Sequence, residues 1–212
     1  MGIIFDCDGV LVDSERLVCR LESELLTRWG WPLSAEQSRH EFKGHAFPDI
    51  ARRIEETLGE RLPPQWMYTW AMETANLFCH ELTEVDGVRA VLERVVRAGR
   101  PVAVASQSPL PRVRISLRVT DLARYFEGLV FTSSMVPRPK PAPDLFLHAA
   151  RALGVSPEHC TVVEDSPSGV RAAVAAGMRV LGYAGDENAA RLIEAGAQPF
   201  HAMSELAELL GV

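Results

Sequence analysis

Short apolar runs alternate with longer amphipathic stretches along most of the 212-residue chain. The runs are too short for helices and are bounded by polar residues, so they predict strands buried on both faces of a parallel sheet. We expect strands at residues 3–5, 101–106, 129–133, 161–164 and 179–182. Helical patterns separate most of these runs, which predicts a doubly wound α/β core.

Glycines mark the ends of the predicted helices. Residues 88–96 place valines and a leucine on one face before Gly99, and the stretches before Gly154 and Gly177 have the same pattern. Glycine is favoured just after the last helical turn, where the backbone turns left-handed. The spacing therefore predicts three helices of the core.

Residues 14–86 break the alternation, because they contain helical patterns and no clear strand. All four tryptophans of the chain lie in this segment. We interpret it as a helical domain inserted after the first strand of a catalytic domain. The predicted domains are residues 1–13 with 87–212, and residues 14–86.

Several local signals support helices inside the insertion. Leucines spaced four apart between residues 17 and 25 form an apolar stripe. Ser34 and Gln37 have the spacing of a capping box. Pro48 and Pro64 are expected in or near the first turns of two further helices.

Composition is that of an ordinary globular protein, with 47% hydrophobic and 24% charged residues. The net charge is −6 and no basic block occurs. This argues against a nucleic-acid surface, although a small anionic ligand needs only a local positive site.

The cysteines show no metal-binding or disulfide spacing, so we expect isolated buried thiols in a reducing compartment. They are Cys7, Cys19, Cys79 and Cys160. No apolar run approaches the roughly 18–20 residues that span a bilayer, and no signal peptide is evident. We expect a cytoplasmic monomer that does not bind a membrane.

Asp6 and Asp8 follow the first predicted strand, and Gly9 permits a sharp turn. Ligands of open α/β sheets bind beyond the carboxyl ends of the strands. Two close carboxylates suit Mg²⁺, and either can act as a nucleophile or as an acid and base. An EF-hand loop is excluded, because the required acid and glycine are replaced by Val10 and Leu11. A solvated acidic turn explains this motif alone equally well.

A second acidic pair, Glu164 and Asp165, follows another apolar run. Ser166 and Pro167 have the order of a helix N-cap and first-turn residue. Asp165 could simply cap this helix. However, two acidic pairs at two strand ends would repel each other strongly unless a cation lay between them.

Ser106 and Lys140 are the remaining candidates. Ser106 ends a predicted strand, where a hydroxyl and free backbone N–H groups can hold a phosphoryl oxygen, although a turn serine is the commoner explanation. Lys140 and Lys43 are the only lysines in the chain. Lys140 lies between two prolines, which would restrict where its ammonium group points. This selective use of lysine favours a functional role over an ordinary surface position.

Together these motifs form an ordered set: Asp-x-Asp, Ser, Lys and Glu-Asp, each near a strand end. The set resembles the haloacid dehalogenase superfamily, and the resemblance covers essentially the whole chain. The matching stretches are residues 5–15, 105–108, 140–144 and 163–169. The helical insertion is similar to the small cap of the branch that contains β-phosphoglucomutase and many sugar-phosphate phosphatases.

The resemblance implies a role for each motif. Asp6 would be the nucleophile that forms an aspartyl-phosphate, and Asp8 the general acid and base. Mg²⁺ would be held by Asp6, the backbone carbonyl of Asp8, and Asp165, with Glu164 as a ligand or as a partner of the ligands. Ser106 and Lys140, together with Gln107, would bind the phosphoryl group of a small phosphorylated metabolite.

The inserted domain would select the substrate. Lys43 lies in a predicted loop of the insertion, and the resemblance implies that it contacts substrate. His45 lies in the same loop, but an ordinary structural or surface histidine is the preferred interpretation.

Three other functions fit these motifs less well. A sugar phosphomutase of the β-phosphoglucomutase type resembles the chain, but Val18 stands where such enzymes typically have a histidine, and Phe47 near the place of a basic residue. A dehalogenase usually lacks the second aspartate, which is Asp8 here. A signalling receiver domain would have no helical insertion after its first strand. We therefore expect a Mg²⁺-dependent phosphatase of sugar phosphates, with the phosphomutase as the alternative.

Overall fold

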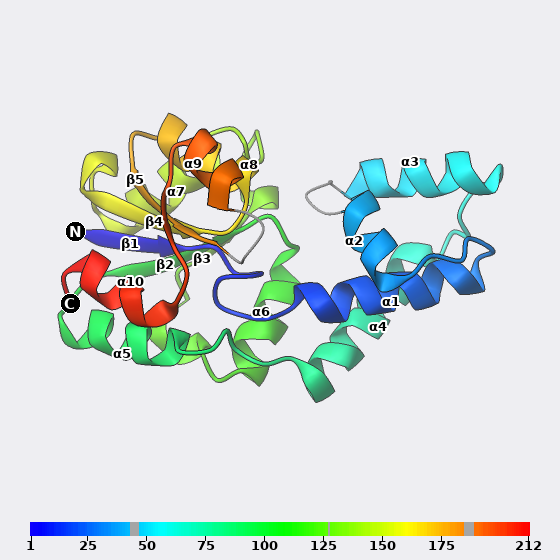
Figure 1. The fold of residues 1–212 in the computed structure, drawn as a ribbon, viewed down its shortest axis with the longest axis horizontal. Helices are drawn as coiled ribbons and strands as arrows, with labels where there is room; N and C mark the ends of the chain where they lie inside the picture. Colours follow the sequence, from blue (N-terminus) through cyan, green and yellow to red (C-terminus); the bar gives the residue numbers. More distant parts are fainter. Residues whose placement is uncertain (43–46, 127, 185–188) are drawn as a thin grey trace. The chain divides into compact units, whose positions relative to one another are not determined.

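The structure is a computed structural model that describes residues 1–42, 47–126, 128–184 and 189–212 (Figure 1). The described residues form two compact units. The first, here called the core unit, consists of Met1–Asp13 and Thr83–Val212. The second, here called the helical unit, consists of Ser14–Leu82.

A six-stranded parallel sheet forms the centre of the core unit, with the strand order β3-β2-β1-β4-β5-β6. The strands are β1 (Gly2–Phe5), β2 (Val102–Ser106), β3 (Val130–Thr132), β4 (Cys160–Glu164), β5 (Arg179–Tyr183) and β6 (Gln198–Phe200). The order runs outward from β1 in both directions, so β1 lies between β2 and β4. This is the doubly wound arrangement that the alternation of strands and helices predicts.

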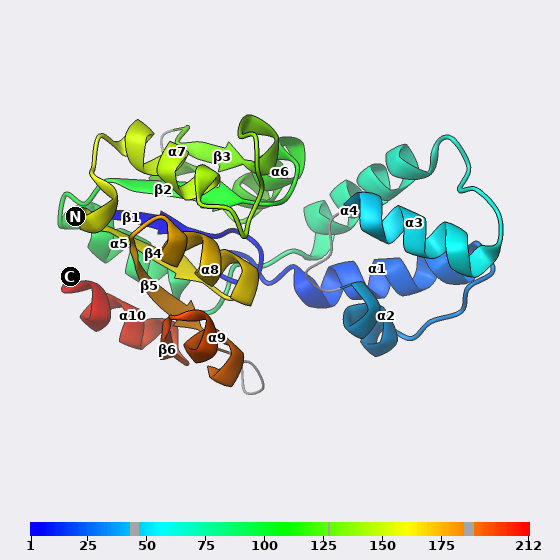
Figure 2. The same ribbon diagram turned by 90° about the horizontal axis from the view of Figure 1, so that it is seen from above.

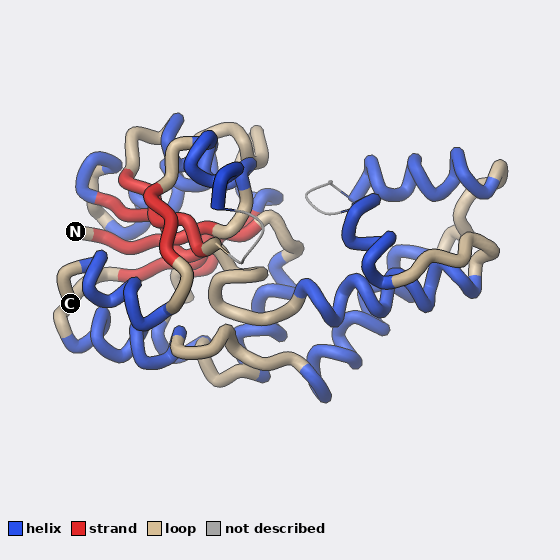
Figure 3. Tube along the Cα trace, viewed as in Figure 1, coloured by secondary structure: helices blue, strands red, loops and turns tan. Residues whose placement is uncertain are grey.

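Helices cover both faces of this sheet (Figures 1 and 3). On one face lie α7 (Asp144–Leu153), α8 (Pro167–Ala175) and α9 (Ala189–Ala195). On the other lie α5 (Val88–Arg97), α6 (Leu110–Val119) and α10 (Met203–Leu210). Three short 3₁₀ turns, η1 (Ala123–Tyr125), η2 (Ser133–Met135) and η3 (Pro157–His159), complete the connections.

Burial on both faces explains why the strands are so uniformly apolar. Ile3, Ile4 and Phe5 of β1 are fully buried, as are Val162 and Val163 of β4. All five predicted strands are present, each within two residues of its expected ends. The predicted fold class is therefore confirmed.

The sixth strand, β6, was not predicted. It has three residues, and its central residue, Pro199, has no N–H to donate to a neighbouring strand. Such a residue is tolerated at the edge of a sheet, where β6 lies (Figure 2). A sequence pattern of this length and composition does not distinguish a strand from a loop.

The helical unit contains α1 (Glu15–Arg28), α2 (Ala35–Phe42), α3 (Phe47–Leu58) and α4 (Trp66–Glu81). Its core gathers Leu25, Leu26, Ile54 and Trp70, all at most 2% exposed. The Ser34–Gln37 capping box is confirmed: the backbone N–H of each residue donates to the side-chain oxygen of the other, at 2.8 and 3.1 Å.

The two connections between the units run beside each other in the core unit. The N–H of Asp13 donates to the carbonyl of Thr83 at 3.0 Å, and the N–H of Val85 donates to the carbonyl of Leu11 at 3.0 Å. This pairing attaches residues 83–86 to the core unit, whereas the sequence pattern placed the boundary after residue 86.

The cysteines agree with expectation in three cases and differ in one. Cys7, Cys19 and Cys160 are buried free thiols, but Cys79 is exposed. Its position on α4 lies outside the apolar side of that helix, which is formed by Trp70 and Phe78. No helix in the described part of the chain is long and apolar enough to cross a membrane.

Candidate active site

The strand order determines where three of the predicted site residues lie. Asp6 comes immediately after β1, Ser106 ends β2 and Glu164 ends β4. The three strands are parallel neighbours, with Phe5 in register with Val104 on one side and Val163 on the other. Their carboxyl ends therefore bring the three side chains to the same edge of the sheet.

Lys140 reaches this edge from the proline-rich loop before α7. Its Nζ donates to Asp6 Oδ1 at 2.6 Å, to Glu164 Oε1 at 2.6 Å and to the carbonyl of Ala105 at 3.0 Å. Only 1% of its side chain is exposed. An ammonium group has three N–H donors, so every donor of Lys140 has a partner in this structure.

The electrostatics of this group follow from burial and close charges. Burial alone would lower the pKa of Lys140, but the carboxylates of Asp6 and Glu164 together raise it well above its ordinary value. Burial raises the pKa of Asp6 to about 7, against the opposing effect of Lys140 and with a further contribution from Glu164. Lys140 is thus a permanent cation beside two buried acids.

Glu164 is held from both sides. Its Oε1 accepts from Lys140, while its Oε2 accepts from the N–H of Asp165 at 2.9 Å and from the N–H and hydroxyl of Ser166 at 2.8 and 2.9 Å. Ser166 also accepts the N–H of Gly169, which confirms it as the N-cap of α8. Glu164 therefore joins Lys140 to the N-cap of α8.

Gly169 is required by this arrangement. A Cβ atom at this position would lie 1.7 Å from Glu164 Oε1 and 2.0 Å from its Cδ. Real Cβ atoms essentially never approach other heavy atoms so closely. The glycine of the Asp165-Ser166-Pro167-Ser168-Gly169 run thus makes room for the buried carboxylate.

Asp8 lies in a different environment from Asp6. Its Oδ2 accepts from the hydroxyl of Ser108 at 2.6 Å, and its Oδ1 accepts from the guanidinium of Arg112 at 2.9 Å. About a quarter of the Asp8 side chain is exposed, against 11% for Asp6. Two carboxylates separated by one residue are therefore held by two different cations.

Asp165 lies against the turn that carries the two aspartates. Gly9 has a φ of +82°, and a Cβ atom there would lie 2.3 Å from Asp165 Oδ2. Both the left-handed backbone and the close carboxylate require glycine at this position. The first and last acidic motifs of the chain thus meet at one place.

Ser106 and Gln107 form the start of the connection from β2 to α6. Ser106 is 1% exposed, and its Oγ accepts the N–H of Ser108 at 3.0 Å. The side chain of Gln107 is exposed, and the backbone carbonyl of this residue accepts from the hydroxyl of Ser133 at 3.0 Å. The loop is fixed by contacts of its own and by β3 beside it.

The donor set of this edge fits a divalent cation. Four carboxyl groups, those of Asp6, Asp8, Glu164 and Asp165, lie at this edge with two cationic side chains, Lys140 and Arg112, so the acids outnumber the cations by two. Among the described residues no group of three or more His, Cys, Asp or Glu side chains forms a complete metal site. Mg²⁺ needs no such group, since it is usually held by one or two carboxylates together with water and substrate phosphate.

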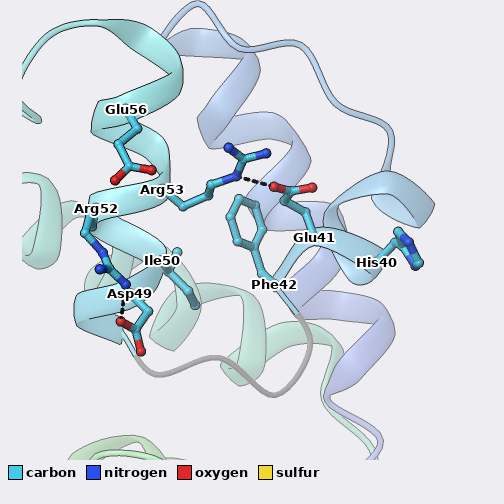
Figure 4. Close-up of a pocket in the computed structure, with 8 residues that line it drawn as sticks. All are labelled: His40, Glu41, Phe42, Asp49, Ile50, Arg52, Arg53 and Glu56. Carbon is cyan, nitrogen blue, oxygen red and sulfur yellow. Dashed lines mark hydrogen bonds and ion pairs between the residues drawn. The ribbon is translucent and has the colours of Figure 1, made fainter.

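The helical unit has a pocket of its own, between α2 and α3 (Figure 4). Its volume is about 690 Å³, and ion pairs of Glu41 with Arg53 and of Asp49 with Arg52 line it. The predicted substrate residue Lys43, like His45, lies outside the described residues.

The structure adds two residues that the sequence interpretation did not assign, Ser108 and Arg112. Ser108 lies within the motif that contains Ser106, so its position could have drawn attention to it. Arg112 had no comparable signal, because α6 was not predicted and its direction relative to Asp8 depends on the packing of that helix. Pro111 in the first turn of α6 is the local feature that could have predicted this helix.

Together, the fold and this cluster of site residues point to the class of protein to which the chain belongs. The sequence profile of the haloacid dehalogenase-like hydrolases matches residues 3–183, most of the chain. The chain therefore belongs to the haloacid dehalogenase-like hydrolase family. This finding confirms the family, the fold and the enzyme class that the ordered motifs predicted.

Individual relatives are similar over nearly their whole length. The 6-phosphogluconate phosphatase of Escherichia coli (strain K12) is 30% identical over 209 residues, which cover 98% of this chain and 93% of that protein. A phosphorylated carbohydrates phosphatase of Thermotoga maritima is 32% identical over 220 residues, covering 99% of each chain. The crystal structure of a family hydrolase from Deinococcus radiodurans R1, with bound phosphate and sodium, is 29% identical with a TM-score of 0.82 and covers 99% of this chain and 94% of that one.

Proposed function

We propose that this protein is a Mg²⁺-dependent phosphatase of small phosphorylated metabolites, in particular sugar phosphates. One observation carries the proposal: Lys140 joins Asp6 to Glu164 at the carboxyl edge of the sheet, with Asp8 two residues from Asp6. The names of the full-length relatives support the substrate class. The proposed catalytic domain is the core unit, and the helical unit is its cap.

Asp6 is the proposed nucleophile. Lys140 holds its Oδ1, and no hydrogen bond to Oδ2 is found among the described residues. Oδ2 can therefore attack the phosphorus atom of a bound ester. The new bond joins this oxygen to phosphorus while the bond to the sugar oxygen breaks, which gives an aspartyl-phosphate.

Asp8 is the proposed general acid and base. In the first step it gives a proton to the departing sugar oxygen, so that a neutral alcohol leaves. In the second step it takes a proton from the water that attacks phosphorus. The bond to Asp6 then breaks, and inorganic phosphate and the free carboxylate are formed. Asp8 is restored to its protonated form, ready for the next substrate.

Ser106, Gln107 and Lys140 are proposed to bind the phosphoryl group. The Ser106 hydroxyl accepts a hydrogen bond from a backbone N–H, which leaves its own proton for a phosphoryl oxygen. The three donors of Lys140 already have partners, so its main contribution is charge. In the buried site its ammonium group offsets the negative charge of the phosphoryl group as transfer proceeds.

Mg²⁺ is proposed to bind Asp6, the backbone carbonyl of Asp8, and Asp165. When bound, it would supply positive charge that offsets the repulsion between the acids and the phosphate. Glu164 was also a candidate ligand, but both of its oxygens accept hydrogen bonds from fixed donors. We therefore assign Glu164 the task of holding Lys140 and the backbone of Asp165.

Substrate choice is proposed to depend on the helical unit, with Lys43 contacting the sugar. We also propose that the protein is a cytoplasmic monomer, since the reaction needs neither a second copy of the chain nor a membrane. Gel filtration would check the oligomeric state.

Phosphate release tests the proposal directly. The purified protein would be assayed with glucose 6-phosphate, fructose 1-phosphate, 6-phosphogluconate and a hexitol phosphate, each with Mg²⁺ and with a chelator. We expect release from one or more of these esters, loss of activity with chelator, and recovery when Mg²⁺ is returned. Activity that is indifferent to chelation would refute the metal assignment. Isomerised sugar phosphate without free phosphate would favour a phosphomutase instead.

A further inference from the structure

The carboxylate of Asp8 is held at both oxygens by one short segment of the chain. Ser108, in the connection after β2, donates to Oδ2 at 2.6 Å, and Arg112, in the first turn of α6, donates to Oδ1 at 2.9 Å. Asp8 itself follows β1. The contact therefore joins two strand ends of the core unit through the side chain that carries the proton in the proposed reaction.

We propose that Arg112 is a positioning residue for Asp8, with Ser108 as its partner in the same task. The inference rests on the proposed phosphatase function, in which Asp8 must lie within hydrogen-bond reach first of the sugar oxygen and then of the attacking water. A carboxylate joined to a short aspartate side chain can rotate. Two donors on its two oxygens fix both its position and the plane of the group.

The supports on both sides of the contact are rigid. Val113 and Leu117, on the buried face of α6, are at most 2% exposed, so the helix that carries Arg112 is packed into the core unit. Cys7 and Val10, which flank the Asp8 turn, are fully buried. The backbone at either end of the ion pair is therefore held by packing, which is the condition for a precise catalytic group.

The degree of burial also favours a functional ion pair over a surface one. The side chains of Arg112 and Asp8 are 20% and 26% exposed, whereas the Arg20–Glu81 pair of the helical unit is 40% and 45% exposed. The charges of Arg112 and Asp8 are therefore less screened by water, and their contact is stronger than an exposed one. Enough exposure remains for a substrate oxygen to approach Asp8.

A role in substrate binding is the main alternative for Arg112. An arginine at the edge of the site could instead hold an anionic group of the substrate. The two roles differ in their kinetics. A positioning residue lowers kcat and acts only through Asp8, whereas a substrate contact raises KM and acts whether or not Asp8 is present.

The experiment compares Arg112→Met and Arg112→Lys with Arg114→Met, a matched control at an exposed arginine of the same helix. Two substrates would be used: the fastest sugar phosphate of the panel above, and p-nitrophenyl phosphate, whose leaving group departs without a proton. For Arg112→Met we expect kcat on the sugar phosphate to fall about 10- to 100-fold with KM within about 3-fold, because a misplaced catalytic group costs up to about 100-fold. Arg112→Lys should recover part of this loss, and the control should match the wild type.

Comparing the two leaving groups distinguishes a positioning role of Arg112 from a general loss of activity in the variant. Release of p-nitrophenol in a single turnover reports the first chemical step, which needs no proton from Asp8 with this ester. We expect that rate to stay within about 3-fold of wild type in Arg112→Met. Equal slowing of both substrates would overturn the inference. Ser108→Ala should show the same selectivity to a smaller degree, and it keeps the test decisive if Arg112→Met does not fold.

A double-mutant cycle completes the test. If Arg112 acts through Asp8, adding Arg112→Met to Asp8→Asn should change the remaining activity by less than about 3-fold. If the fold-losses of Arg112→Met and Asp8→Asn multiplied in the double variant, or if Arg112→Met raised KM at unchanged kcat, Arg112 would make a separate contact with substrate. Either result would refute the inference. A wild-type protein that hydrolyses none of the panel would instead refute the proposed function itself, a result that is distinct from either outcome in the variants.

Discussion

The carboxyl ends of β1 and β4 present two acids with the same nearest cation and different remaining contacts. Asp6 and Glu164 both accept a hydrogen bond from Lys140 at 2.6 Å, and both are buried. Glu164 uses its second oxygen for three further donors. Asp6 has hydrogen bonds to Oδ1 alone among the described residues. Only Asp6 therefore has an oxygen to spare for chemistry.

The difference teaches that charge and the distance to Lys140 do not by themselves identify the nucleophile among the buried acids. Both oxygens of Glu164 are engaged by buried or half-buried donors, so this carboxylate fixes the structure around it, because each lost hydrogen bond would leave one of these donors unpaired. A carboxylate with one free oxygen can form a new bond without breaking an old one. The number of hydrogen bonds accepted, more than the ion pair, separates the two acids.

The largest effect is expected from Asp6→Asn. The amide oxygen can still accept from Lys140, and the amide nitrogen can take the place of the free oxygen, so the fold should be retained. The variant lacks a nucleophile, and we expect phosphate release to fall by about 10⁴-fold or more. Phosphate assays on the sugar-phosphate panel would measure the loss, and thermal unfolding would show whether the melting temperature stays near that of wild type. Undiminished turnover would refute the role of Asp6 as the nucleophile, and with it the proposed difference between Asp6 and Glu164.

Glu164→Gln tests the other side of the comparison. Glutamine has one oxygen and one NH₂ group, but both oxygens of Glu164 accept hydrogen bonds, so in either orientation the NH₂ group meets a donor. We expect a loss of about 2–4 kcal/mol in the free energy of unfolding, typical of a broken buried pair, and a smaller loss of activity than in Asp6→Asn. Urea unfolding would measure the difference. If Asp6→Asn destabilised the protein as much as Glu164→Gln does, the two acids would not have separate roles.

Gly169→Ala tests how tightly the contacts of Glu164 hold its carboxylate in place. In a helix alone, replacing glycine by alanine stabilises by about 1 kcal/mol. Here the added Cβ would collide with the Glu164 carboxylate, so we expect the sign to reverse, with a net loss of about 1–3 kcal/mol. Ser168→Ala, at the preceding residue of the same turn, is the control. A stabilised Gly169→Ala would mean that Glu164 moves aside without cost, contrary to the tight set of contacts proposed for it.

These contacts also mark the limit of what the sequence predicts. Five of the six strands follow from buried apolar runs, because in a parallel sheet each run is apolar on both faces. β6 is too short and contains Pro199. Helix α6 has only three buried residues, and one of them is a serine: Val113, Ser116 and Leu117. No clear apolar stripe therefore predicts this helix from the sequence.

For the site, the order of the motifs predicts which residues meet, since the carboxyl ends of neighbouring parallel strands share an edge. It does not predict how many hydrogen bonds each acid accepts. The three donors to Glu164 Oε2 come from Asp165 and from Ser166, the N-cap of α8. The two donors to Asp8 come from Ser108, in the connection into α6, and from Arg112, in the first turn of that helix. Those contacts depend on helix positions that a linear pattern does not specify.

The smallest effect is expected from Glu81→Gln, a matched substitution in the helical unit. Arg20 donates to Glu81 at 2.7 Å, a distance close to the 2.6 Å contacts of Lys140. Both side chains are more than one third exposed, so water screens the charges and replaces the lost contact. We expect a change below about 0.5 kcal/mol in the free energy of unfolding by the same urea method. A loss as large as that of Glu164→Gln would show that contact distance, and not burial with full hydrogen bonding, determines how strongly a carboxylate of this protein supports its fold.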